Sequence, residues 1–134
     1  MQLHYLDFDF SEDELGHACW DALACVPPER WEALLAEAQA LLAWCEQQGG
    51  PAGDMDAGFG WDFDLQATAE RGEQTTPIAI TWTAPFLQAT GPQDGNTRCC
   101  LGLSISTVRR MERSALARAR GLAGTTADRE LVAA

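Results

Sequence analysis

The sequence has 134 residues, of which 20 are Asp or Glu and 9 are Lys or Arg, so its formal net charge is −11 at neutral pH. All the basic residues are arginine, and the missing lysine excludes a Walker phosphate-binding lysine, a Schiff-base lysine and a Ser-Lys catalytic pair. Hydrophobic residues make up 46% of the chain, a share typical of a globular protein, and the length favours one domain.

No apolar run reaches the roughly 18 residues that a membrane helix needs, so no membrane is expected as a partner. Residues 1–10 are acidic and alternating, unlike a secretory signal. His17, Cys19 and Cys25 lie close together, but their spacing fits no usual structural zinc site, and neither a metal nor another cofactor is expected. Reduced thiols in a bacterial-type cytoplasm are expected for all five cysteines: Cys19, Cys25, Cys45, Cys99 and Cys100.

The first element in chain order is a strand, because apolar and polar residues alternate up to Phe10. Its Leu6 and Phe8 share one face, while Asp7 and Asp9 share the other. Residues 11–27 begin with an acidic turn. We expect a loop there, with a short helical piece around Trp20–Leu23.

Residues 28–48 carry a helical spacing that two prolines open and two glycines end. One stripe is apolar and should face the core: Trp31, Leu34, Leu35, Ala38, Leu41, Leu42 and Cys45. The opposite side carries four alanines with Trp44 at its edge. Either another helix or a second subunit covers this side, or the alanines supply helix propensity alone.

Three strand-like stretches follow a Gly- and Asp-rich loop over residues 49–60, and turn-rich connections separate them. They span residues 61–68, 77–83 and 97–106, and the middle one could extend through 86–88.

Ser106 or Thr107 can cap a final helix that runs to about Leu122, and residues 125–134 have the composition of a flexible tail. The element order is then β-α-β-β-β-α. It predicts an α+β domain over residues 1–124, built as a two-layer sandwich whose mostly antiparallel sheet has two helices on one face.

The most distinctive motif occurs twice, as Leu6-Asp7-Phe8-Asp9-Phe10 and as Trp61-Asp62-Phe63-Asp64-Leu65. In extended chain each copy sends its two aspartates away from the core. If the two strands are neighbours, the candidate binding residues Asp7, Asp9, Asp62 and Asp64 form one patch. Three interpretations stay open: a merely solvated polar face, a Ca²⁺ or Mg²⁺ site, and a surface for an arginine-bearing partner.

Charge is divided unevenly, because five arginines gather on the expected last helix, among them Arg109, Arg110 and Arg113. Leu101-Gly102-Leu103-Ser104 and the residues after it resemble the recognition half of a sigma-factor region 4 helix-turn-helix, which implies DNA binding. The segment upstream has no helical period for the required first helix, and the negative net charge opposes phosphate binding.

The two Asp-Phe-Asp segments also resemble short bacterial proteins of similar size with no assigned function, and this resemblance implies a single domain. No EF-hand, P-loop or catalytic signature is present, so no catalytic residue is predicted. The leading hypothesis is a small, soluble, non-enzymatic interaction module, homo-oligomeric, which contacts itself or another protein through Trp44 and the Arg109, Arg110 and Arg113 cluster. The alternatives are a cation-binding enzyme or sensor that uses the aspartates, and a nucleic-acid binder that uses the last helix.

Overall fold

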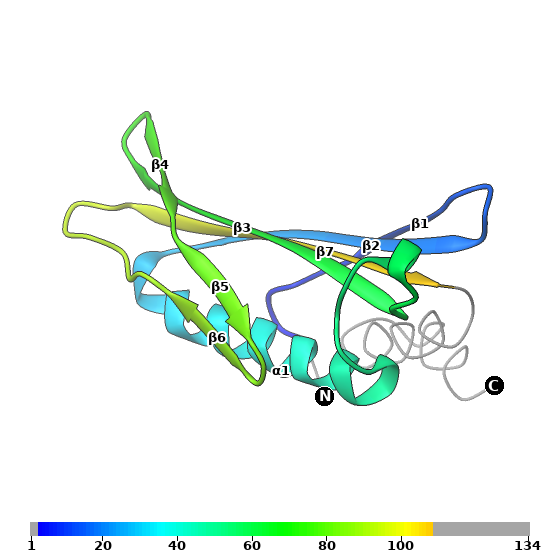
Figure 1. The fold of residues 1–134 in the computed structure, drawn as a ribbon. Coiled ribbons are helices and arrows are strands. Elements are labelled where there is room, and N and C mark those ends of the chain that lie inside the picture. Colours follow the sequence, from blue (N-terminus) through cyan, green and yellow to red (C-terminus); the bar gives the residue numbers. More distant parts are fainter. Residues whose placement is uncertain (1–2, 109–134) are drawn as a thin grey trace.

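Strand β7 (Arg98–Val108) lies at the centre of a five-stranded sheet of order β1-β2-β7-β3-β4 (Figure 1). The structure is a computed structural model that describes residues 3–108. Strands β2 (His17–Val26) and β3 (Trp61–Arg71) flank β7, and β1 (Asp9–Glu12) and β4 (Gln74–Ile78) form the edges. All the pairs in this sheet are antiparallel.

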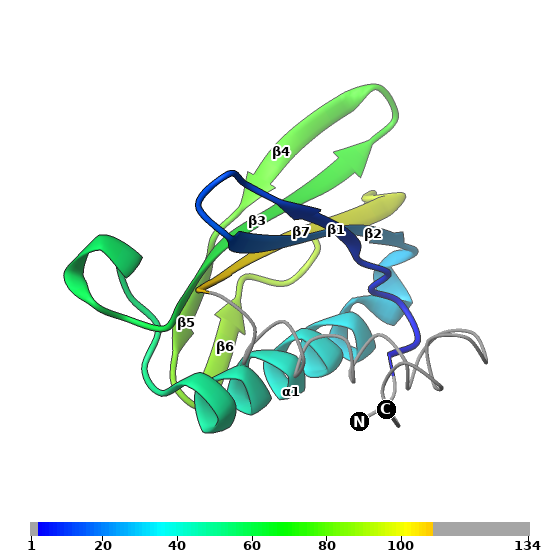
Figure 2. The same cartoon turned by 90° about the vertical axis from the view of Figure 1, so that its right-hand side faces the viewer.

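A second layer covers one face of the sheet, which we call the inner face (Figure 2). It consists of helix α1 (Trp31–Gly49) and a separate hairpin of β5 (Ile80–Thr83) and β6 (Phe86–Ala89). The 3₁₀ turns η1 (Pro28–Arg30) and η2 (Met55–Ala57) lie on either side of α1 in the chain.

A mostly antiparallel sheet packed against a helix confirms the α+β class. The predicted order β-α-β-β-β-α is wrong, because two strands precede α1 and five follow it within residues 3–108. In that part of the chain one α-helix lies on the inner face, and most of the second predicted helix falls outside it.

Helix α1 confirms the helix predicted over residues 28–48. Its six buried side chains belong to the predicted stripe, and Leu35 of that stripe is half-buried. The helix ends at Gly49 and is capped by Gly50, whose φ of 78° suits a residue without a Cβ and whose N–H donates to the carbonyl of Glu46 at 2.8 Å.

Strand β2 corrects the prediction of a loop with a short helical piece in residues 11–27. Trp20, at the expected helical piece, is a strand residue that is 3% exposed. The period of two is weak in the sequence, because most core-facing positions hold alanine while the opposite face includes Leu23. The core-facing residues of β2 are Ala18, Trp20, Ala22, Ala24 and Val26.

The strand predicted over residues 77–83 is also corrected, because it is two strands that belong to two different sheets. β4 ends at Ile78 on the edge of the large sheet, and β5 begins at Ile80. Residues 86–88 do not extend this strand but return along β5 as part of β6. The hairpin is tied to α1 by the N–H of Leu87, which donates to Oε1 of Gln39 at 2.9 Å.

The final predicted helix cannot begin at Ser106 or Thr107, since both residues lie within β7. Thr107 faces the core and is 1% exposed, so its side chain is not at a helix terminus. The rest of that helix, up to Leu122, and the predicted tail over 125–134 lie outside the described residues.

The core lies between the inner face and α1. The inner side of β7 is its most buried row, with each side chain at most 1% exposed: Cys99, Leu101, Leu103, Ile105 and Thr107. Trp61 of β3 is fully buried, and its indole N–H donates to the carbonyl of Gly50 at 2.7 Å, which fixes the end of α1 against the sheet.

Glu37 of α1 fastens the segment before β1 to the helix. Its carboxylate accepts the backbone N–H groups of Tyr5 at 2.9 Å and Leu6 at 2.7 Å, and also that of His4. These donors belong to chain that is not paired in the sheet, so the carboxylate replaces a strand partner.

We predict that Glu37→Ala lowers the free energy of unfolding by about 1–3 kcal/mol, because it leaves partly buried backbone donors without an acceptor. Urea denaturation measures the change. Glu32→Ala removes an exposed carboxylate from the first turn of the same helix and serves as the control. Equal unfolding midpoints for the two variants would contradict the role given to Glu37.

Candidate functional site

The outer face of the sheet carries the candidate site. No element among residues 3–108 packs across this face, while α1 and the β5–β6 hairpin lie on the opposite side (Figure 2). Side chains alternate along each strand, so the residues between the buried positions of β7 point outward. Ser104 and Gly102 are the central residues of this outer row.

Three carboxylates and one hydroxyl form a row across four strands of the outer face. Asp9 of β1 is opposite Asp21 of β2, Asp21 is opposite Ser104 of β7, and Ser104 is opposite Asp64 of β3. The Ser104 hydroxyl donates a hydrogen bond to Oδ1 of Asp21. Strands β1 and β3 are therefore not neighbours. The strand predicted up to Phe10 is also corrected, because β1 begins only at Asp9 and Asp7 lies in the unpaired segment before it. Asp7, Asp9 and Asp64 nevertheless border one surface.

These carboxylates border a shallow, open hollow of about 560 Å³, which we call the acidic depression. Its acidic residues are Asp7, Asp9, Asp21 and Asp64. Leu23 also lines it and is 72% exposed, so an apolar side chain stands among the charges.

Asp62 is the one predicted binding residue that does not line the acidic depression. It lies one row further along β3, opposite Ser106, and its Oδ1 accepts the backbone N–H of Phe63 at 2.8 Å. Asp21 takes its place in the depression. The sequence analysis missed Asp21 because its segment was not expected to be a strand. The signal that could have found it is the spacing of Cys19, Asp21 and Leu23, which in an extended chain lie on one face.

The geometry does not favour a cation site. Within the described range, 3–108, no group of three or more His, Cys, Asp or Glu side chains is placed to hold a metal ion. Neither of the ion pairs seen in that range, His17–Asp13 and Arg98–Glu70, includes a carboxylate of the acidic depression. Within the described residues, the carboxylates of the acidic depression are therefore not neutralised by an ion pair.

The turn between β1 and β2 uses another aspartate. Asp13 accepts the backbone N–H groups of His17 at 2.8 Å and Leu15 at 2.9 Å. The hydrogen bond from the His17 N–H is the main cause that holds the pKa of Asp13 below its ordinary 3.8. Because the pKa of Asp13 is lower in the folded protein than in the unfolded chain, its ionised carboxylate stabilises the turn above pH 3.8. This stabilisation is lost as the pH falls through the folded pKa.

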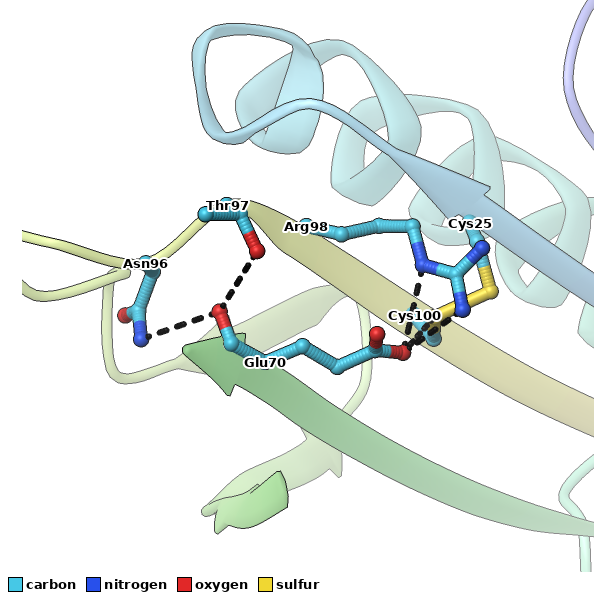
Figure 3. Close-up of polar contacts among 6 residues, drawn as sticks. All are labelled: Cys25, Glu70, Asn96, Thr97, Arg98 and Cys100. Atoms are coloured by element: carbon cyan, nitrogen blue, oxygen red, sulfur yellow. Dashed lines mark hydrogen bonds and ion pairs between the residues drawn. A yellow bond between two sulfur atoms is a disulfide. The ribbon is translucent and has the colours of Figure 1, made fainter. Parts of the chain in front are cut away.

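Cys25 and Cys100 form a disulfide between β2 and β7, with a sequence separation of 75, which corrects the prediction of five reduced thiols (Figure 3). Their backbones are directly opposite in the register. Sequence could not reveal this pairing, because it depends on which strands are neighbours. Cys19 and Cys99 are free thiols, and Cys45 is buried in α1.

The predicted interface residues are placed only in part. Trp44 is half-buried and packs against the core, so its ring is partly withdrawn from any partner. Within the part of the chain that the structure describes, Ala33, Ala36 and Ala40 of the second helix face are exposed. Arg109, Arg110 and Arg113 lie outside the described residues.

The helix-turn-helix resemblance is not supported by the backbone of its first part. Leu101, Gly102, Leu103 and Ser104, which would form the turn, are consecutive strand residues of β7. The residues that resemble the recognition helix begin at the end of this strand, and those beyond Val108 lie outside residues 3–108.

Comparisons with protein-family models, with curated proteins and with solved structures found no match. Among the described residues, α1 and the shorter helical turns lack the length and apolar character needed to cross a membrane.

We predict that Asp9→Asn raises the free energy of unfolding by about 0.2–1 kcal/mol, because Asp9 and Asp21 are like charges directly opposite on neighbouring strands. Urea denaturation at low ionic strength should show the gain, and added salt should reduce it. Asp56→Asn makes the same change of charge in the exposed η2 turn and is the control. A stability loss in Asp9→Asn would show that this carboxylate is stabilised rather than repelled in the fold.

Proposed function

We propose that this chain is a small, soluble, non-enzymatic protein-interaction module whose contact surface is the acidic depression. The observation that carries the proposal is the set of four carboxylates around one open hollow whose lining residues include no cationic side chain. Such a cluster is self-repelling, and a cationic partner relieves the repulsion. The exposed Leu23 adds apolar area that a bound side chain can cover.

The partner that fits this surface is an arginine-rich segment. Arginine donates paired hydrogen bonds to carboxylates, and its stem can pack on an apolar side chain. Residues 109–120 of this chain hold five arginines and one glutamate, whereas residues 1–108 hold 17 acidic and 3 basic side chains. The two parts of the sequence are therefore complementary in charge.

We infer that the arginine-rich segment binds the acidic depression of a second copy. β7 passes the depression at Ser104 and runs on to Val108, opposite His17, so the chain is moving away from the depression where the segment begins. Return to its own depression would need a reversal. A reciprocal exchange between two copies satisfies both surfaces at once, as in a twofold dimer.

A nucleic-acid function through Arg109 and Arg110 receives less support, because phosphates would be repelled by the acidic remainder of the chain. A cytoplasmic location stays a prediction, since the Cys25–Cys100 bond removes the argument from reduced cysteines on which it was based. The resemblance to short bacterial proteins likewise stays a prediction.

The test is sedimentation velocity of the full chain at tens of micromolar. We expect a dimer at about 0.01 M salt and a monomer at about 1 M, because the Debye length falls from about 30 Å to about 3 Å. Asp21→Asn with Asp64→Asn should give a monomer at both salt concentrations. Arg109→Ala with Arg110→Ala and Arg113→Ala should do the same.

Arg30→Ala with Arg129→Ala removes two arginines outside the proposed contact and should leave the dimer intact. A monomer at low salt would contradict the proposal. A dimer that resists salt and survives both sets of substitutions would assign self-association to another surface, such as the exposed alanine side of α1.

A further inference from the structure

The Cys25–Cys100 disulfide has one accessible sulfur and one enclosed sulfur. Cys25 is an exposed residue, whereas Cys100 is 6% exposed. Both side chains lie on the outer face, beyond the acidic depression and toward the start of β7. A molecule that approaches from solvent therefore meets Cys25 first.

The enclosed sulfur of Cys100 lies beside the carboxylate of Glu70 (Figure 3). Oε2 of Glu70 lies 3.5 Å from Sγ of Cys100, at a distance where it can accept a hydrogen bond from the Cys100 thiol of the reduced protein. The same oxygen accepts from Arg98, with Nη2 at 2.8 Å and Nε at 3.2 Å. Figure 3 shows Glu70 reaching toward the Cys100 side of the bond.

We propose that this disulfide is a thiol–disulfide exchange site, at which a low-molecular-weight thiol attacks Cys25 and Cys100 is the leaving group. The inference does not depend on the proposed dimer or on its acidic depression. It follows from the accessibility of the Cys25 sulfur and the enclosure of the Cys100 sulfur.

The exchange is balanced in two steps. In the first step the thiolate RS⁻ bonds to Sγ of Cys25, the bond between Cys25 and Cys100 breaks with its electron pair on Sγ of Cys100, and solvent supplies the proton of the new thiol. In the second step another RS⁻ attacks the R-bearing sulfur, which releases RSSR and the Cys25 thiolate. Two external thiols are oxidised and one protein disulfide is reduced.

Two other cysteines, Cys19 and Cys99, are poorly suited to attack this disulfide. Burial, followed by the hydrogen bond and charge of Asp21, raises the pKa of Cys19, and burial raises the pKa of Cys99. Because the thiolate is the nucleophile, both are poor attackers of the disulfide. Backbone pairing of β2 with β7 continues on both sides of Cys25, so reduction need not separate the strands.

The decisive test uses the wild-type chain with reduced glutathione. We expect the rate of disulfide cleavage in the folded protein, followed by intact mass, to rise in proportion to the thiolate concentration and to exceed the rate of global unfolding. Peptide mapping after acid quench should place transient glutathione on Cys25. Cleavage at a rate independent of thiol concentration and equal to the unfolding rate would overturn the proposal, as would glutathione trapped mainly on Cys100.

Variants separate the two sulfurs. The Cys100→Ser variant retains only the accessible cysteine of the pair, Cys25. Glutathione disulfide should form a mixed disulfide on Cys25 that lasts, because no Cys100 thiol is present to displace the glutathione. Cys25→Ser should react at least tenfold more slowly at Cys100. Cys19→Ser, which leaves the pair intact, is the matched control and should behave as the wild type. Equal reactivity of the two sulfurs would overturn the assignment.

Glu70 and Arg98 are proposed as positioning residues with opposite effects. A carboxylate beside Cys100 disfavours its departure as a thiolate, and a guanidinium favours it. Glu70→Gln should therefore speed cleavage several-fold and Arg98→Ala should slow it. If both substitutions change the rate in the same direction, their effect is structural and this part of the proposal is wrong.

Discussion

The register of β7 between β2 and β3 is the constraint on which the other features depend. The core-facing side chains of β7 are at most 1% exposed: Cys99, Leu101, Leu103, Ile105 and Thr107. Only this one of the two alternating sets of β7 side chains therefore fits the inner face. A slip of one residue would turn these side chains outward and bring Ser104 into the core. The same phase sets Asp9, Asp21 and Asp64 in one row on the outer face. It also sets Cys25 opposite Cys100.

Within residues 3–108, no cationic side chain lining the acidic depression offsets the mutual repulsion of its carboxylates. Ser104 donates to Asp21, but Asp7, Asp9 and Asp64 share the same hollow, whose lining includes no cationic side chain. By contrast, Glu70 has Arg98 beside it and Asp13 has His17. This difference within one chain is the reason to regard the depression as a contact surface.

Sequence predicted the parts of the fold in which periodicity and residue type agree. Helix α1 has Leu and Trp at helical spacing with Pro and Gly at its ends. β2 was missed because Ala18, Ala22 and Ala24 give a weak apolar signal although they are buried. Because β2 was not predicted, Asp21 was not predicted as a residue of the candidate site. The disulfide could not be foreseen, because Cys25 and Cys100 become neighbours only through the pairing of β2 with β7.

The most direct test of this account is the register of β2 against β7, measured by nuclear Overhauser effects in solution. Cys25–Cys100 has a Cα–Cα distance of 4.0 Å, so this pair and every second pair from it, including Asp21–Ser104, are the closely spaced pairs of the ladder. The account predicts a strong contact between the Hα protons of Asp21 and Ser104. A contact from Asp21 to Leu103 or Ile105 instead would contradict it, because Asp21 and Ser104, and likewise Cys25 and Cys100, would then be on different faces.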